Sequence, residues 1–145
     1  MYIISNIIKG GSFVITKSDD YKDFYHQIYL LLSKTNLIDM FDIEYCAENM
    51  RFLQYFRGKT QRKHIILSKH YTQNLSENQV LQDIEVMNEC EEADIIKIVL
   101  NEKHSLEILD QVVFEKPLIR LKLGNLGIFL IYSYILTLSR KTQQS

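Results

Sequence analysis

The sequence predicts an α/β fold in which parallel β-strands alternate with α-helices. The first observation behind this prediction is the run 93–100, a continuous stretch of mostly β-branched and aliphatic residues around a single lysine. Such a run is typical of a strand that is buried on both faces in a helix-covered parallel sheet. The second observation is the regular alternation of such runs with segments of helical periodicity, which favours right-handed βα units.

Five strand candidates share a high content of β-branched and aliphatic residues: 3–8, 40–45, 64–68, 93–100 and 117–123. Helices are expected in four segments, which lie between these strands: 18–33, 47–57, 76–90 and 104–113. Five strands are fewer than the eight of a complete barrel, so the sheet is either an open one or part of a barrel.

The composition is that of one soluble domain, 1–145, because 46% of its residues are hydrophobic and 24% are charged. The 17 Lys and Arg residues nearly balance the 18 Asp and Glu residues, so we expect neither nucleic acid nor a membrane as a partner. A small-molecule substrate is compatible with this balance. Cys46 and Cys90 lack the spacing of metal ligands, and the amino terminus lacks a secretory signal. We therefore expect a cytoplasmic protein with reduced thiols and no bound metal.

Lys97 lies in the middle of the buried run 93–100, where a cation is costly. One interpretation is a lysine whose stem lies on apolar surface while its ammonium reaches water. The other is a desolvated amine that attacks a carbonyl group as a nucleophile. Because sites in parallel α/β folds lie beyond the carboxyl ends of the strands, we expect Lys9, Glu44 and His70 on one rim, with Lys97 reaching toward it.

Four segments resemble successive strands of one enzyme family, in order and at similar spacing: Asp42-Ile43-Glu44, 65–70 with Ser68-Lys69-His70, 93–99 with Lys97, and 117–127 with Gly124-Asn125-Leu126-Gly127. The family is type I 3-dehydroquinate dehydratase. The resemblance implies a partial TIM-type β/α barrel of about five parallel strands that alternate with helices. It also implies the family's step in the shikimate pathway, the dehydration of 3-dehydroquinate to 3-dehydroshikimate through a lysine Schiff base, without metal or cofactor.

The resemblance implies that Lys97 is the Schiff-base lysine and that His70 is the histidine that transfers protons. These residue types suit the chemistry, since a neutral amine attacks a carbonyl and an imidazole can accept and return a proton near neutral pH. Glu44 matches a carboxylate of the family's polar site and Asp42 lies one pleat deeper, so both are candidates for substrate binding. A solvent-facing acid at the end of its strand is the alternative for Glu44.

The chain also departs from the family. An arginine and a glutamate of the family fall on Ser5 and Lys9, and the arginine that binds the substrate carboxylate falls on Ile131. The tail 128–145 diverges, and its apolar part 128–138 is shorter than the about 20 residues that span a bilayer, so we expect a buried or partner-covered strand or helix there.

Three hypotheses for the function follow from these matches and departures. The first is a dehydratase with Lys97 as its nucleophile, and the second is a non-catalytic pseudoenzyme or interaction module on a truncated barrel. The third is an α/β domain in which Lys97 and His70 are incidental. Because a partial barrel leaves strand edges open, we also expect a homodimer that covers them.

Overall fold

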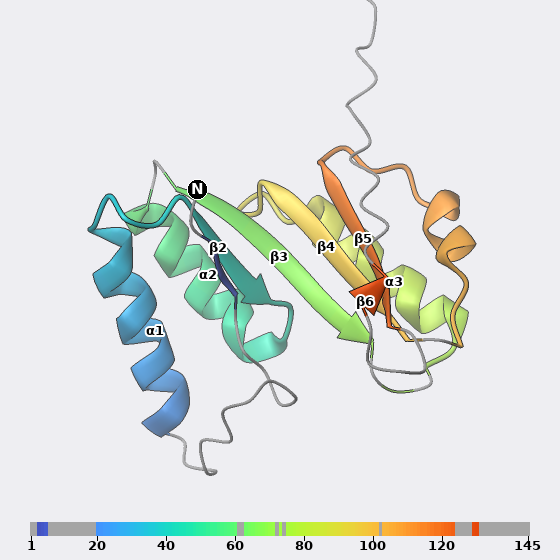
Figure 1. Cartoon of the computed structure of the whole chain (residues 1–145), viewed down its shortest axis with the longest axis horizontal. Coiled ribbons are helices and arrows are strands. Elements are labelled where there is room, and N and C mark those ends of the chain that lie inside the picture. Colours follow the sequence, from blue (N-terminus) through green and yellow to red (C-terminus); the bar gives the residue numbers. More distant parts are fainter. Residues whose placement is uncertain are drawn as a thin grey trace, which may run out of the picture.

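The computed structural model describes residues 3–5, 20–60, 63–71, 73, 75–101, 103–123 and 129–130. In this part of the chain one sheet contains six strands in sequential order: β1 (Ile3–Ser5), β2 (Met40–Glu44), β3 (His64–Tyr71), β4 (Ile95–Leu100), β5 (Leu118–Leu123) and β6 (Phe129–Leu130). The first five strands pair in parallel, and β6 pairs antiparallel with β5. Five parallel strands in chain order confirm the predicted α/β fold (Figure 1).

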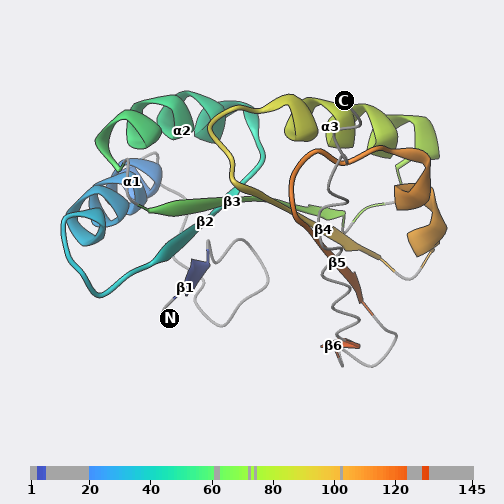
Figure 2. The same cartoon turned by 90° about the horizontal axis from the view of Figure 1, so that it is seen from above.

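Three α-helices lie on one side of the sheet, as the two views in Figure 1 and Figure 2 show: α1 (Asp20–Ser33), α2 (Ala47–Lys59) and α3 (Glu77–Glu89). Helix α3 begins after Ser76, whose side-chain oxygen accepts a hydrogen bond from the backbone N–H of Gln79. This cap satisfies one of the unpaired N–H groups of the first turn.

A helix is expected over 104–113, and the structure has the shorter 3₁₀-helix η1 (Leu106–Gln111) there, which connects β4 to β5. The side chain of Ser105 accepts a hydrogen bond from the N–H of Glu107, which starts this tighter helix. A 3₁₀-helix rises about 2.0 Å per residue, against about 1.5 Å for an α-helix. The same number of residues therefore spans a longer distance in this connection to β5 than it would as an α-helix.

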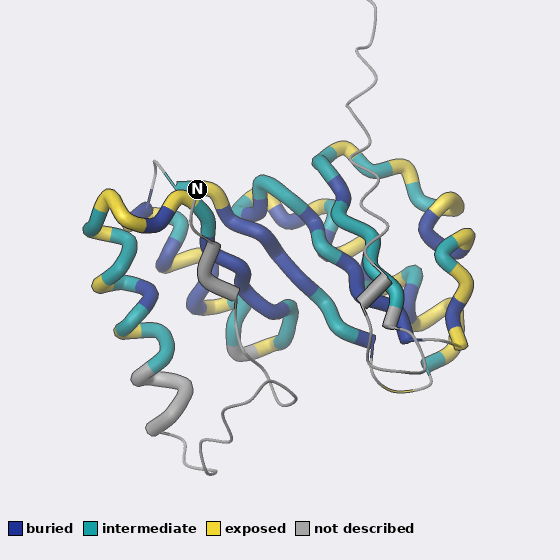
Figure 3. The backbone as a smooth tube through the Cα atoms, in the orientation of Figure 1, coloured by how far each residue is buried: buried dark blue, intermediate teal, exposed yellow. Residues whose placement is uncertain are grey.

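Alternating residues of the strands pack against the helices, and we call this side of the sheet the helix face. Its fully buried side chains include Phe41 and Ile43 from β2, which belong to one cluster with Tyr29, Phe52 and Phe56 of the helices. Figure 3 shows that much of the central strand β3 is buried. The rings of Phe41 and Phe56 meet edge to face with centroids 5.0 Å apart. Each such side chain contributes about 1.5–3 kcal/mol of transfer free energy to folding. The helix face therefore supplies the hydrophobic core that holds the strands in place.

A bidentate ion pair fixes the amino-terminal ends of the strands. The guanidinium of Arg57, near the end of α2, donates to both carboxylate oxygens of Asp94 at 3.1 and 2.6 Å. One of these oxygens also accepts the backbone N–H of Ile65 in β3 at 2.8 Å. Asp94 immediately precedes β4, so this cluster joins α2, β3 and β4 in one arrangement.

Several predicted features lie outside the described residues. These are Lys9, the glycine turn at 124–127, Ile131 and most of the apolar segment 128–138, of which only Phe129–Leu130 is described, as strand β6. Among the described helices none is long and apolar enough to cross a membrane.

Candidate active site

Three rows of side chains cross the sheet on the side that faces away from the helices, which we call the site face. The strand registers define the rows, because residues paired between neighbouring parallel strands point to the same side. From the carboxyl ends of the strands toward their amino ends, the rows are His70, Val99 and Leu121, then Glu44, Ser68, Lys97 and Ile119, then Asp42, Ile66 and Ile95. All four sequence-predicted site residues therefore lie on this one face.

The ammonium of Lys97 ends on a buried carboxylate. Its Nζ atom donates to Oδ2 of Asp42 at 2.7 Å, and the side chains of the two residues are 16% and 3% exposed. Asp42 lies two strands away and one row nearer the amino ends, so the lysine side chain extends across β3. A charge at this depth needs a partner, because an isolated ion in the interior costs several kcal/mol. The position of Lys97 is thus set by Asp42.

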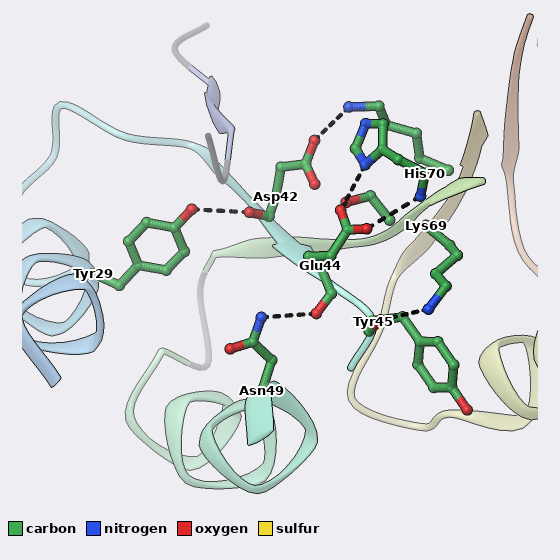
Figure 4. Close-up of polar contacts among 9 residues, drawn as sticks. Tyr29, Asp42, Glu44, Tyr45, Asn49, Lys69 and His70 are labelled. Carbon is green, nitrogen blue, oxygen red and sulfur yellow. Dashed lines mark hydrogen bonds and ion pairs between the residues drawn. The ribbon is translucent and has the colours of Figure 1, made fainter. Parts of the chain in front are cut away.

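Asp42 is itself held by the helix layer. The hydroxyl of Tyr29, in α1, donates to the backbone carbonyl of Asp42 at 2.9 Å (Figure 4). Tyr29 is 1% exposed and belongs to the aromatic core. The core therefore fixes the backbone of β2 at the residue whose carboxylate points to the opposite side.

The imidazole of His70 is fixed by Glu44. Its Nδ1 atom lies 2.6 Å from Oε2 of Glu44, and its backbone N–H donates to Oε1 at 3.1 Å (Figure 4). An ionised carboxylate only accepts hydrogen bonds, so Nδ1 carries the hydrogen and Nε2 is the nitrogen that can take or give a proton. The His70 side chain is 33% exposed, which leaves the ring accessible to a ligand.

Glu44 is not a solvent-facing acid, and that interpretation is wrong. Only 8% of the residue is exposed, and its buried carboxylate accepts from His70 and, at 3.4 Å, from the hydroxyl of Ser68. Its backbone carbonyl accepts from the amide of Asn49 in α2 at 2.9 Å. The sequence did not indicate a role for Ser68 in this site. The signal that could have found it is its spacing of two residues from His70, which places both on one face of a strand.

The two pairs are separate. Lys97 bonds to Asp42 and His70 bonds to Glu44, and in the described part of the chain no hydrogen bond joins Lys97 to His70. The two residues lie on adjacent strands and in adjacent rows. From the strand spacing and the rise per residue, their Cα atoms are about 8 Å apart. A small molecule bound at Lys97 would be within reach of the imidazole.

Lys69, between Ser68 and His70 in the sequence, belongs to the helix face. Its Nζ atom donates to the carbonyl of Tyr45 at 3.2 Å and lies 5.2 Å from the centroid of that ring. The neighbouring Tyr71 is 2% exposed, and burial, together with the charge of Asp83, raises the pKa of its phenol. The pleat therefore separates two adjacent basic residues, Lys69 and His70, into different environments.

Among the described residues, no group of three or more His, Cys, Asp or Glu side chains is placed so that it could hold a metal ion. Cys46 and Cys90 form no disulfide. Burial, followed by a hydrogen bond to Glu92, raises the pKa of the Cys90 thiol, so this cysteine is a poor nucleophile.

The fold and the site define an α/β sheet of partial-barrel type with a lysine and a histidine on one face. No protein-family model matches the sequence, and no curated protein matches it. Among solved structures the chain is similar to a type I 3-dehydroquinate dehydratase from Clostridium difficile, solved with covalently modified comenic acid. The TM-score is 0.67 at 18% identity, and the match covers 84% of this chain and 50% of that one.

A second similar structure is the 3-dehydroquinate dehydratase from Enterococcus faecalis. Its TM-score is 0.58 at 19% identity, with 81% of this chain and 51% of that chain covered. The chain thus spans about half the length of both proteins. At this identity the likeness shows the fold, which is the α/β arrangement of these barrel enzymes.

Proposed function

We propose that the chain carries an imine-forming site of the 3-dehydroquinate dehydratase type, with Lys97 as nucleophile and His70 as acid and base. The observation that carries this proposal is that both groups lie on one face of a parallel sheet, each held by its own buried carboxylate. Pairs of this kind orient reactive side chains before a substrate binds. The structural likeness to the two dehydratases supports the same chemistry.

Imine formation requires Lys97 to lose a proton to solvent before it reacts. The Nζ lone pair then forms a bond to the carbonyl carbon, and a proton passes from the nitrogen to the carbonyl oxygen to give a neutral carbinolamine. Protonation of that hydroxyl and cleavage of the carbon–oxygen bond release water and leave an iminium ion. The iminium carries the same positive charge as the original ammonium, so Asp42, 2.7 Å from Nζ, is its counter-ion.

His70 supplies the proton transfers that a dehydration needs. In this reaction the carbon beside the iminium loses a proton, and the hydroxyl on the next carbon leaves as water after receiving one. A second water molecule then hydrolyses the imine and restores the lysine. Nε2 of His70 can accept the first proton and return it to the leaving hydroxyl. Glu44 acts through the ring by fixing its tautomer and direction, and is therefore a positioning residue.

Both carboxylates were predicted to bind substrate. In the structure each carboxylate is paired with a base, Asp42 with Lys97 and Glu44 with His70. A direct contact of either one with substrate stays a prediction.

Reductive trapping tests the proposal. The protein is incubated with borohydride and either cyclohexanone or 3-dehydroquinate, and adducts are located by peptide mass spectrometry. We expect an adduct at Lys97 in excess over the exposed Lys34, because Lys97 lies on the strand next to His70, whose imidazole can transfer the protons that imine formation needs. Lys97→Arg is the matched control, since it keeps a cation near Asp42 and forms no imine. Labelling of Lys97 no faster than Lys34 with both compounds would contradict the proposal.

The second candidate is a non-catalytic descendant of the same fold. It is favoured by the finding that, in the described part of the chain, no hydrogen bond joins Lys97 to His70. The substitutions Ser5, Lys9 and Ile131, relative to the family, also favour it. Conversion of 3-dehydroquinate to a conjugated enone, followed by ultraviolet absorbance, decides between the two. Turnover that disappears in Lys97→Arg would exclude the non-catalytic candidate.

A further inference from the structure

The site face is chemically divided across the sheet. On β2 and β3 its side chains are mostly polar, and two of them, Asp42 and Glu44, are carboxylates that are 2% and 8% exposed. On β4 and β5 the residues in the same rows are apolar apart from Lys97: Ile95, Val99, Ile119 and Leu121. A molecule bound to Lys97 therefore lies between an acidic side and an apolar side.

The charges on this face disfavour an anion. Asp42 balances Lys97 while the lysine is an ammonium, and Glu44 adds a further negative charge when His70 is neutral. When Lys97 becomes a neutral amine, both carboxylates lack a full counter-charge. Like charges separated by several ångströms in a partly buried site repel by about 2 kcal/mol or more. An anionic compound is thus opposed at the stage at which the amine must react.

Three cations in the described strands and helices beside this site are engaged elsewhere. Arg57 binds Asp94 at the amino ends of the strands, and Arg120 of β5 binds Asp110 of η1 at 2.5 Å on the helix face. Lys69 also points to the helix face, where it bonds to Tyr45. The charged ends of Arg57, Arg120 and Lys69 therefore lie away from Lys97 and its neighbours on the site face.

We infer that the carbonyl compound accepted by Lys97 is an uncharged aldehyde or ketone. Its apolar flank lies toward Val99, Ile119 and Leu121, and its hydroxyl groups donate to the carboxylates of β2. This inference rests on the proposed imine chemistry and narrows the class of its substrate. It also implies that a carboxylate such as 3-dehydroquinate reacts more slowly than an uncharged analogue.

A pair of probes that differ only in charge tests the inference. The full chain is treated with cyanoborohydride and either 3-oxocyclohexane-1-carboxamide or 3-oxocyclohexane-1-carboxylate near neutral pH. In each case the iminium on Lys97 accepts a hydride and becomes a stable secondary amine. We expect the carboxamide adduct at Lys97 to form at least about tenfold faster than the carboxylate adduct. Equal rates, or a faster carboxylate, would overturn the inference while leaving imine formation intact. Labelling of Lys97 by neither probe would remove both proposals.

Two arginine variants give the matched control. Leu121→Arg places a cation on the apolar side of the site face, one row from Lys97. Val113→Arg places the same charge at a residue that is 86% exposed and follows η1. We expect Leu121→Arg to raise the carboxylate-to-carboxamide ratio at least about fivefold and Val113→Arg to leave it unchanged. Circular dichroism establishes that both variants are folded. An unchanged ratio in folded Leu121→Arg would contradict the charge argument.

Discussion

The two faces of strand β2 are buried to nearly the same extent and are stabilised in different ways. Phe41 and Ile43 are 0% and 1% exposed and pack against the aromatic residues of the helices. Asp42 and Glu44 alternate with them, are 2% and 8% exposed, and each forms an ion pair with one base. On the helix face burial itself provides the free energy, whereas on the site face it is a cost that the partner must offset. Burial alone therefore does not distinguish core from site.

The helix face should give the largest loss of stability on truncation. Phe56→Ala removes a fully buried ring that contacts Phe41 and Phe52, and we expect it to lower the free energy of unfolding by about 3–5 kcal/mol. Tyr55→Ala, at the preceding residue of α2, is the control. Tyr55 is 55% exposed, so its truncation should change stability by about 0.5 kcal/mol or less. Urea denaturation measures both, and a similar loss in the two variants would contradict the assignment of the core.

On the site face, we expect stability to depend on the ion pair between Lys97 and Asp42 more than on the volume of the side chains. Lys97→Met keeps an unbranched side chain but leaves the carboxylate of Asp42 without its cation, and we expect a loss of about 3 kcal/mol. Adding Asp42→Asn removes the uncompensated charge, so the double variant should be more stable than Lys97→Met alone. Urea denaturation of the two single variants and the double variant provides the cycle. Additive effects would mean that the two residues do not interact in the folded protein.

A smaller effect on stability, with a larger effect on reactivity, is expected for Glu44→Gln. Glutamine preserves the shape of the side chain but weakens the charge-assisted bond to Nδ1 of His70. We expect a loss of about 1–2 kcal/mol in stability and a fall of at least about tenfold in any Lys97-dependent turnover. Asn49→Ala, which removes only a bond to the Glu44 backbone, is the comparison. An equal fall in turnover in both variants would show that Glu44 acts through the backbone rather than through the imidazole.

The smallest expected effect is a difference in alkaline stability that originates on the helix face. Burial raises the pKa of Tyr71 above its ordinary value of 10.0, with Asp83 contributing in the same direction. Above pH 10 the unfolded chain loses this proton while the folded chain keeps it, so the stability must fall as the pH rises. The urea midpoint should therefore decrease above pH 10, and less steeply in Tyr71→Phe. Identical slopes would mean that the phenol is not protected in the folded protein.

Local patterns predicted most of the fold. The runs that contain Lys97 and His70 form strands, and Ser76 caps its helix, because side-chain alternation and capping act over a few residues. The sequence predicted a helix before β5 but not its kind, which is the 3₁₀-helix η1. The capping serine and the apolar residues of this segment are compatible with an α-helix and with a 3₁₀-helix. Which of the two forms depends on the distance that the connection must span.

The sequence by itself determined which residues could react and the approximate strands on which they lie. Only the tertiary structure decided which carboxylate meets which base. Asp42 and Lys97 are 55 positions apart, and Glu44 and His70 are 26 apart. Their pairing follows from the registers of β2, β3 and β4, which the packing of the helix face establishes over the whole sheet. A slip of one residue in a strand would exchange its two faces, which is why no local pattern could specify the two pairs.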